Sequence, residues 1–254
     1  MKQISYYILE RLHINKDTGN RHYNYHPKTS DELKELVDKL VKERGNEADL
    51  NDIDTAKITD MNYIFYNSKF NGDISEWDVS NVKNMSYIFY DSKFTGKNGD
   101  ISNWDVSNVK DMESMFYRSK FNGDISKWDV SKVEDMSFMF GNSSFTGENG
   151  DISNWDVSNV EDMSYMFSNS KFNGDISKWD VSNVKDMNSM FESSEFNGDI
   201  SNWDISNVED MMYMFCNSKF DGDISQWDVS NVEDMRSMFY KSPLEKNPPK
   251  WYTK

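Results

Sequence analysis

The sequence is poor in cysteine and histidine. Cys216 is the one cysteine among 254 residues, so no disulfide can form within the chain and the thiols do not indicate a redox compartment. The three histidines, His13, His22 and His26, all precede the repeated part of the chain. No phosphate-binding loop, nucleophile elbow or Cys/His cluster is present. We therefore expect a protein that is not an enzyme, with no catalytic residues, no cofactor and no assigned metal site.

Positive charge is also scarce. The 44 Asp and Glu residues outnumber the 28 Lys and Arg residues, and the formal net charge is −16. Nucleic-acid binding needs clustered Lys and Arg that release counterions from phosphates, so this balance argues against a nucleic-acid partner. A protein partner with a basic surface fits the charge. The composition leaves the oligomeric state open.

Long apolar runs are absent as well. No stretch reaches the roughly 20 apolar residues of a transmembrane helix, so we expect no membrane span. At the start of the chain, Lys2, Glu10, Arg11 and His13 interrupt the apolar residues. We recognise no signal-peptide core or lipobox there, and therefore expect a cytoplasmic or phage-associated protein in preference to one exported by the ordinary route.

The dominant feature of the sequence is a repeat of the form F-N-G-D-I-S-x-W-D-V-S-N-V-x-D-M-x-x-M-F. Its tryptophans recur at spacings of 27, 24, 27, 24, 24 and 24 residues. They are Trp77, Trp104, Trp128, Trp155, Trp179, Trp203 and Trp227. Units of this length cannot fold alone, so we expect successive copies to lie side by side in register, with like residues touching.

Two hydrophobic spacings alternate within a unit. From Ile74 to Val82 the apolar residues follow the L-x-x-L-x-L spacing of a leucine-rich-repeat strand. From Val82 to Phe89 they fall on one face of a short helix, which Asn108 and Asp111 would begin as N-cap and N3 residues in the following unit. We therefore predict an α/β fold, a right-handed leucine-rich-repeat-like solenoid of about eight strand–helix units of 24–27 residues with an N-terminal helical cap.

The two ends depart from the repeat. The segment Thr29-Ser30-Asp31-Glu32 predicts the start of an amphipathic helix, which Gly45 ends. We divide the chain into an N-terminal helical segment and cap (1–48), a repeat solenoid (49–242) and a C-terminal cap or tail (243–254). Pro248 and Pro249 fall where another strand would begin, and proline cannot donate a hydrogen bond there.

The repeat, over about residues 49–242, resembles the BspA-like leucine-rich repeat surface proteins, also called the DUF285 family or the mycoplasma lipoprotein-associated repeat. Seven consecutive units keep the Trp, Asp, Ser and Met-x-x-(Met/Ile)-Phe of that pattern. The resemblance implies a bacterial, phage or protist origin, a role in adhesion or protein interaction, and no catalytic residues. It also implies that relatives are often exported or lipid-anchored.

An aspartate follows each repeat tryptophan and forms the candidate binding site. The residues are Asp78, Asp105, Asp129, Asp156, Asp180, Asp204 and Asp228. If the tryptophans point inward, these carboxylates point outward at a spacing of about 5 Å. One reading is structural, with each carboxylate bonded to the backbone of the Ser or Asn that follows it. The other is functional, with the carboxylates attracting a basic partner or divalent cations.

The function expected from these observations is non-catalytic protein or surface binding through this acidic strand face. Two alternatives remain open. The chain could be a structural spacer of a bacterial surface or phage particle, or it could be a repeat module stabilised by calcium.

Overall fold

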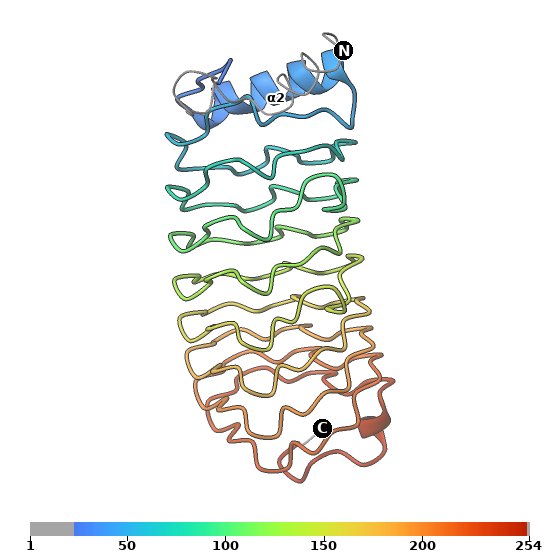
Figure 1. Cartoon of the computed structure of the whole chain (residues 1–254). Coiled ribbons are helices and arrows are strands. Elements are labelled where there is room, and N and C mark those ends of the chain that lie inside the picture. The colour runs from blue at the N-terminus through green and yellow to red at the C-terminus, as the bar shows by residue number, and fades with distance from the viewer. Residues whose placement is uncertain (1–22, 253–254) are drawn as a thin grey trace.

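The computed structural model describes residues 23–252 (Figure 1). In this part of the chain the repeats form coils that lie one above another, and the N-terminal helix lies across one end of the column (Figure 1). The two helical elements are α2 (Ser30–Arg44) and a 3-10 helix, η1 (Pro243–Glu245). The β-type pairing within residues 23–252 consists of isolated parallel bridges.

The helix predicted at the N-terminal end is confirmed. The hydroxyl of Thr29 accepts a hydrogen bond from the Glu32 N–H and so caps α2. Gly45 ends it with a φ of 94°, in the left-handed region that favours glycine. Leu33, Val37 and Leu40 are fully buried in the same core as the first coils. Here the local capping residues and the 3.6-residue periodicity agree.

The prediction of an α/β solenoid of strand–helix units is wrong. Within the described residues the repeats contain neither a regular strand nor a helix, and their coils are runs of consecutive turns (Figure 1). In the segment predicted to be a strand, the Trp77 N–H donates to the Ile74 carbonyl and the Val82 N–H to the Val79 carbonyl. Both bonds join residues three apart, which bends the chain at each step.

The segment predicted to be a helix is also a succession of turns. The Met115 N–H bonds to the Met112 carbonyl within the unit, whereas the Ser114 N–H donates to the Ser137 carbonyl of the next unit. Ser114 and Arg118 have φ values of 53° and 55°, and two such residues recur in each unit. A helix requires right-handed residues and i→i−4 bonds throughout, so it cannot form here. The prediction of Asn108 and Asp111 as helix-capping residues is wrong for the same reason.

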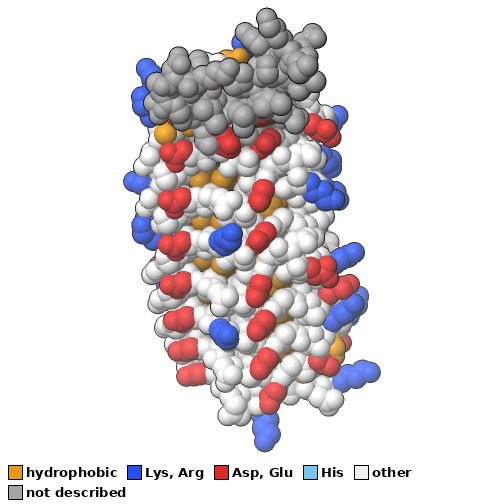
Figure 2. Space-filling view, in the orientation of Figure 1, with side chains coloured by type: hydrophobic (Ala, Val, Ile, Leu, Met, Phe, Trp, Pro, Cys, Tyr) orange, Lys and Arg blue, Asp and Glu red, His pale blue; other side chains and the backbone are white. Residues whose placement is uncertain are grey.

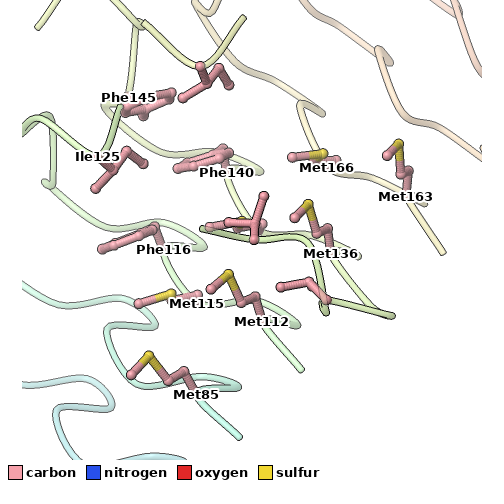
Figure 3. Packing of buried hydrophobic residues seen from close by; sticks show 14 of the residues in the cluster. Met85, Met112, Met115, Phe116, Ile125, Met136, Phe140, Phe145, Met163 and Met166 are labelled. Atoms are coloured by element: carbon pink, nitrogen blue, oxygen red, sulfur yellow. The ribbon is translucent and has the colours of Figure 1, made fainter. Parts of the chain in front are cut away.

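The expectation that like residues touch like residues is confirmed. Phenylalanine rings from successive units stack with centroids 5.4–6.0 Å apart, in the row Phe65, Phe89, Phe116, Phe140, Phe167, Phe191, Phe215 and Phe239. Figure 3 shows Met85, Met112, Met136 and Met163 following one another in the same way. All of these side chains are at most 2% exposed, so the core is continuous from unit to unit.

The tryptophans form a second row of contacts between units. Each repeat indole Nε1–H, from Trp77 to Trp227, and that of Trp251, donates to a carbonyl of the preceding unit at 3.0–3.2 Å. Trp251 also stacks on Trp227, with centroids 6.5 Å apart, and so covers the C-terminal end. Each buried indole thus has the polar partner it requires.

Candidate functional site

The sequence-predicted site is a row of exposed carboxylates, which we call the outer Asp row. All seven members are exposed, and each Oδ1 accepts the backbone N–H of the serine two residues later at 3.0–3.1 Å. The members are Asp78, Asp105, Asp129, Asp156, Asp180, Asp204 and Asp228. This is the local turn that the structural reading of the sequence predicts, and it holds every carboxylate in the same orientation.

Hydrogen bonding stabilises the charged form of three carboxylates in the outer Asp row. The serine hydroxyl first and the serine N–H second lower the pKa of Asp129, Asp204 and Asp228 below the ordinary value for aspartate. Stabilisation of the ionised form by donors is the cause. These three carboxylates are therefore negatively charged at neutral pH.

A parallel row of aspartates precedes the tryptophans by four residues. Asp124 and Asp175 are examples, and in both the backbone N–H of the following serine, followed by its hydroxyl, lowers the carboxyl pKa. Figure 2 shows acidic side chains arranged in rows along the column. The full row comprises Asp73, Asp100, Asp124, Asp151, Asp175, Asp199 and Asp223. Repetition of two identical turns thus gives one surface two rows of carboxylates.

A third row of polar residues, which the sequence analysis places at the starts of helices, is half-buried. Its residues pair with one another through parallel bridges from unit to unit. They are Asp60, Asn84, Asp111, Asp135, Asp162, Asp186, Asp210 and Asp234. Burial is the main cause that raises the pKa of Asp111 and Asp135, and it raises the pKa of Asp186 to about 6. The recurring V-x-D-M motif was the available signal, but the predicted helix gave it another explanation.

Asp186 makes the stability of the protein depend on pH. Its folded-state pKa of about 6 lies above the roughly 3.9 of an unfolded aspartate, so its stabilising contribution is complete below about pH 4 and is lost as the pH rises through about 6. Asp186→Asn keeps an acceptor for the Asn188 N–H and matches Asn84. We expect it to raise the free energy of unfolding at pH 7 by about 1 kcal/mol, after allowance for solvent screening, and to have no effect at pH 4. Denaturant unfolding at both pH values measures this, and a variant less stable than wild type at pH 7 would contradict it.

One group of carboxylates could approach a metal ion. Oxygens of Asp111, Glu113 and Asp135 lie within 4.8 Å of one another. Calcium takes six to eight oxygen ligands, and Oδ1 of both aspartates already accepts a backbone N–H. These three side chains therefore offer less than a calcium site needs.

The sequence analysis did not predict a partly exposed aromatic surface, which we call the tyrosine face. Stacked ring pairs cover it, with centroids 4.4–5.0 Å apart. Its rings are Tyr63, Tyr66, Tyr87, Tyr90, Tyr117, Phe138 and Tyr165. The motif Tyr-x-x-Tyr at residues 63–66 and 87–90 was the signal, because the pair of tyrosines occupies the same positions after the core methionine in both units. A predicted helix would have placed these rings on an ordinary variable surface.

A hollow of about 220 Å³ opens in the tyrosine face. It lies where Ser114 replaces the ring that Tyr87 and Phe138 supply in the adjacent units. Its lining is Tyr87, Tyr90, Glu113, Ser114, Tyr117 and Phe138. Burial raises the pKa of Glu113, whose carboxylate accepts a hydrogen bond from the Tyr87 hydroxyl. The hollow thus combines aromatic walls with a half-buried carboxylate.

A larger hollow of about 610 Å³ lies at the last repeat, where no further unit covers Met235 and Phe239. Cys216 lies elsewhere, is buried, and has a pKa raised chiefly by burial, so its thiol is a poor nucleophile. Nδ1 of His26 lies 3.0 Å from Oδ2 of Asp54. His13 and His22 are outside the described residues.

No helix in residues 23–252 has the length and apolar character needed to cross a bilayer.

Comparison with known proteins gives a family but no function. A family model described as "Mycoplasma protein of unknown function, DUF285" matches residues 32–150 and again residues 142–251. Neither the curated proteins nor the solved structures contain a match. The two family matches together span most of the 254-residue chain and meet within the repeats. The protein therefore belongs to the DUF285 family.

Proposed function

We propose that this protein is a non-catalytic binding protein whose partner is a protein with a basic surface. The observation that carries the proposal is the outer Asp row, because an exposed carboxylate recurs in the same orientation in every repeat. A regular row of like charges attracts a partner of opposite charge over a distance and aligns it along the column.

The distribution of carboxylates supports binding in preference to catalysis. An active site brings chemically different groups together at one point, with a nucleophile, a base and an oxyanion donor within reach of one substrate. Here the same Asp-x-Ser turn is repeated from Asp78 to Asp228. The net charge of −16 adds to the attraction for a basic surface.

Titration with a deca-lysine peptide tests the proposal. The triple variant Asp129→Asn, Asp156→Asn, Asp180→Asn keeps the side-chain acceptors of the turns but removes three adjacent charges. We expect affinity at low salt to fall about 10-fold, from roughly 0.5 kcal/mol per lost charge, and the salt dependence to become flatter.

A matched control removes three charges elsewhere. Glu134, Glu161 and Glu209 are exposed, and the first two pair with Lys110 and Lys185. Their replacement by glutamine changes the net charge by the same amount, and we expect at most about a 3-fold loss. Equal losses in the two variants would show that only net charge matters, and unchanged affinity in the triple Asn variant would refute the proposal.

A further inference from the structure

The tyrosine face changes from one unit to the next while the core beneath it stays constant. The residues that alternate along its first row are at φ values of 53–59°, whether they are tyrosine, phenylalanine or serine. That row is Tyr63, Tyr87, Ser114, Phe138, Tyr165, Ser189, Tyr213 and Ser237. Because the backbone is the same at every position, a serine removes a ring without moving the chain. The aromatic surface is therefore interrupted wherever a serine occurs.

The three serines of this row, Ser114, Ser189 and Ser237, differ in the residue that precedes them. Around Ser114, four aromatic rings border the hollow, and the adjacent residue is Glu113. In the last unit the corresponding adjacent residue is Arg236, whose guanidinium pairs with Asp234. Before Ser189 the corresponding residue is Asn188, so among these three serines only Ser114 directly follows a carboxylate residue.

Negative charge at the hollow has no counter-ion within the described residues. The ion pairs of residues 23–252 involve neither Glu113 nor the nearby Asp111 and Asp135. The Tyr87 hydroxyl occupies Oε1 of Glu113, and no hydrogen bond from a described residue engages Oε2. Burial first, and then the neighbouring aspartates, raise the pKa of Glu113. A cation entering the hollow would offset the repulsion between the Glu113 carboxylate and the neighbouring aspartates.

The size of the hollow selects the kind of ligand. Pockets for cofactors and drug-sized molecules have volumes of about 300–1,000 Å³, whereas this hollow measures about 220 Å³ and is open to solvent. One long side chain of a polypeptide fits this scale. A guanidinium group is planar, stacks on aromatic faces and donates several N–H bonds to carboxylates, whereas an ammonium group does not stack.

We propose that the hollow at Ser114 binds an arginine side chain of the protein partner, stacked between aromatic rings and hydrogen-bonded to Glu113. This inference rests on the proposed function, because the basic partner attracted by the outer Asp row would supply the arginine. The outer Asp row would attract any basic surface, whether its charges come from lysine or arginine. The hollow would provide the preference for arginine over lysine.

Titration with deca-arginine and deca-lysine peptides of equal charge, at pH 7 and low salt, tests this. We expect wild type to bind deca-arginine about 10-fold more tightly than deca-lysine, as stacking and bidentate hydrogen bonding require. Ser114→Tyr fills the hollow with a tyrosine ring. Tyrosine already occupies this position of the row, with a similar φ, in four other units: Tyr63, Tyr87, Tyr165 and Tyr213. The backbone at Ser114 should therefore accommodate it. We expect this variant, and Glu113→Gln, to bind both peptides with similar affinity.

Ser189→Tyr is the matched control, because it makes the same change in the same row at the same φ of 53°, with Asn188 before it in place of Glu113. It should retain the preference for arginine. The triple Asn variant of the outer Asp row should weaken both peptides equally and leave their ratio unchanged. Circular dichroism verifies that each variant is folded.

The outcomes separate the two proposals. If wild type binds both peptides equally and the triple Asn variant weakens both, the basic-partner function stands and the arginine site is refuted. The same holds if folded Ser114→Tyr and Glu113→Gln variants keep the full preference for arginine. If wild type binds neither peptide, both proposals fail.

Discussion

Replacing Trp155 with alanine is expected to lower the free energy of unfolding by about 4 kcal/mol, the largest effect of any single change considered for this protein. Trp155 is 4% exposed and stacks on Trp179 with centroids 6.5 Å apart. Its Nε1–H also donates to the Ile125 carbonyl at 3.2 Å. The substitution opens a cavity in the middle of the core and leaves a buried carbonyl without its donor. Denaturant unfolding followed by far-ultraviolet circular dichroism measures the loss.

Two further variants show how much of this loss depends on the indole hydrogen bond and how much on the position of the ring in the column. Trp155→Phe keeps an aromatic ring but removes the indole donor, and should lose about 1–2 kcal/mol. Trp251→Ala removes a half-buried ring at the end of the column, which stacks on Trp227 alone among the tryptophans, and should lose about 2 kcal/mol. A loss below 1 kcal/mol for Trp155→Ala would mean that the units do not share a continuous core.

Replacing Arg44 with alanine is expected to cost about 3 kcal/mol and to release the N-terminal end first. Two nitrogens of its guanidinium group donate to the two carboxylate oxygens of Asp52 at 2.8 and 2.9 Å. The Asp52 side chain is 3% exposed. Without Arg44 the buried Asp52 carboxylate loses this ion pair and keeps the hydrogen bond from the Asn24 side-chain amide. Limited proteolysis and hydrogen exchange of α2 would detect the change.

Lys34 supplies the control for this experiment. It forms an ion pair with Asp38 on the exposed side of α2, where both groups remain in contact with water. Lys34→Ala should change the free energy of unfolding by less than about 0.5 kcal/mol. Equal effects of the two substitutions would show that the burial of Asp52 is unimportant.

The candidate sites differ in how far the sequence could predict them. The outer Asp row was visible because each Asp precedes a Ser by two residues, and a turn of that kind depends only on adjacent residues. The hollow at Ser114 was not visible, because its lining comes from residues 87–138 in successive units. Whether a serine leaves a hollow or an ordinary surface depends on the rings above and below it.

The half-buried row shows a second reason for the failure of local patterns. Asp111 occupies a position compatible with a helix start, and its carboxylate does accept a nearby N–H, that of Glu113. Only the bridge to Asp135 in the next unit shows that the chain is extended at this point. An apolar spacing of three and four residues arises from successive turns as well as from a helix, so periodicity could not distinguish them.

The order of amino acids alone is enough to establish the repeat, the residues that form the core and the capped helix α2, and it indicates turns at the exposed aspartates. Each of these depends on neighbours in the chain or on the recurrence of apolar positions. The path of the backbone within a unit depends on the adjacent units instead. N–H groups such as that of Ser114 bond to carbonyls in the next copy, and those bonds stabilise left-handed residues that an isolated unit would avoid.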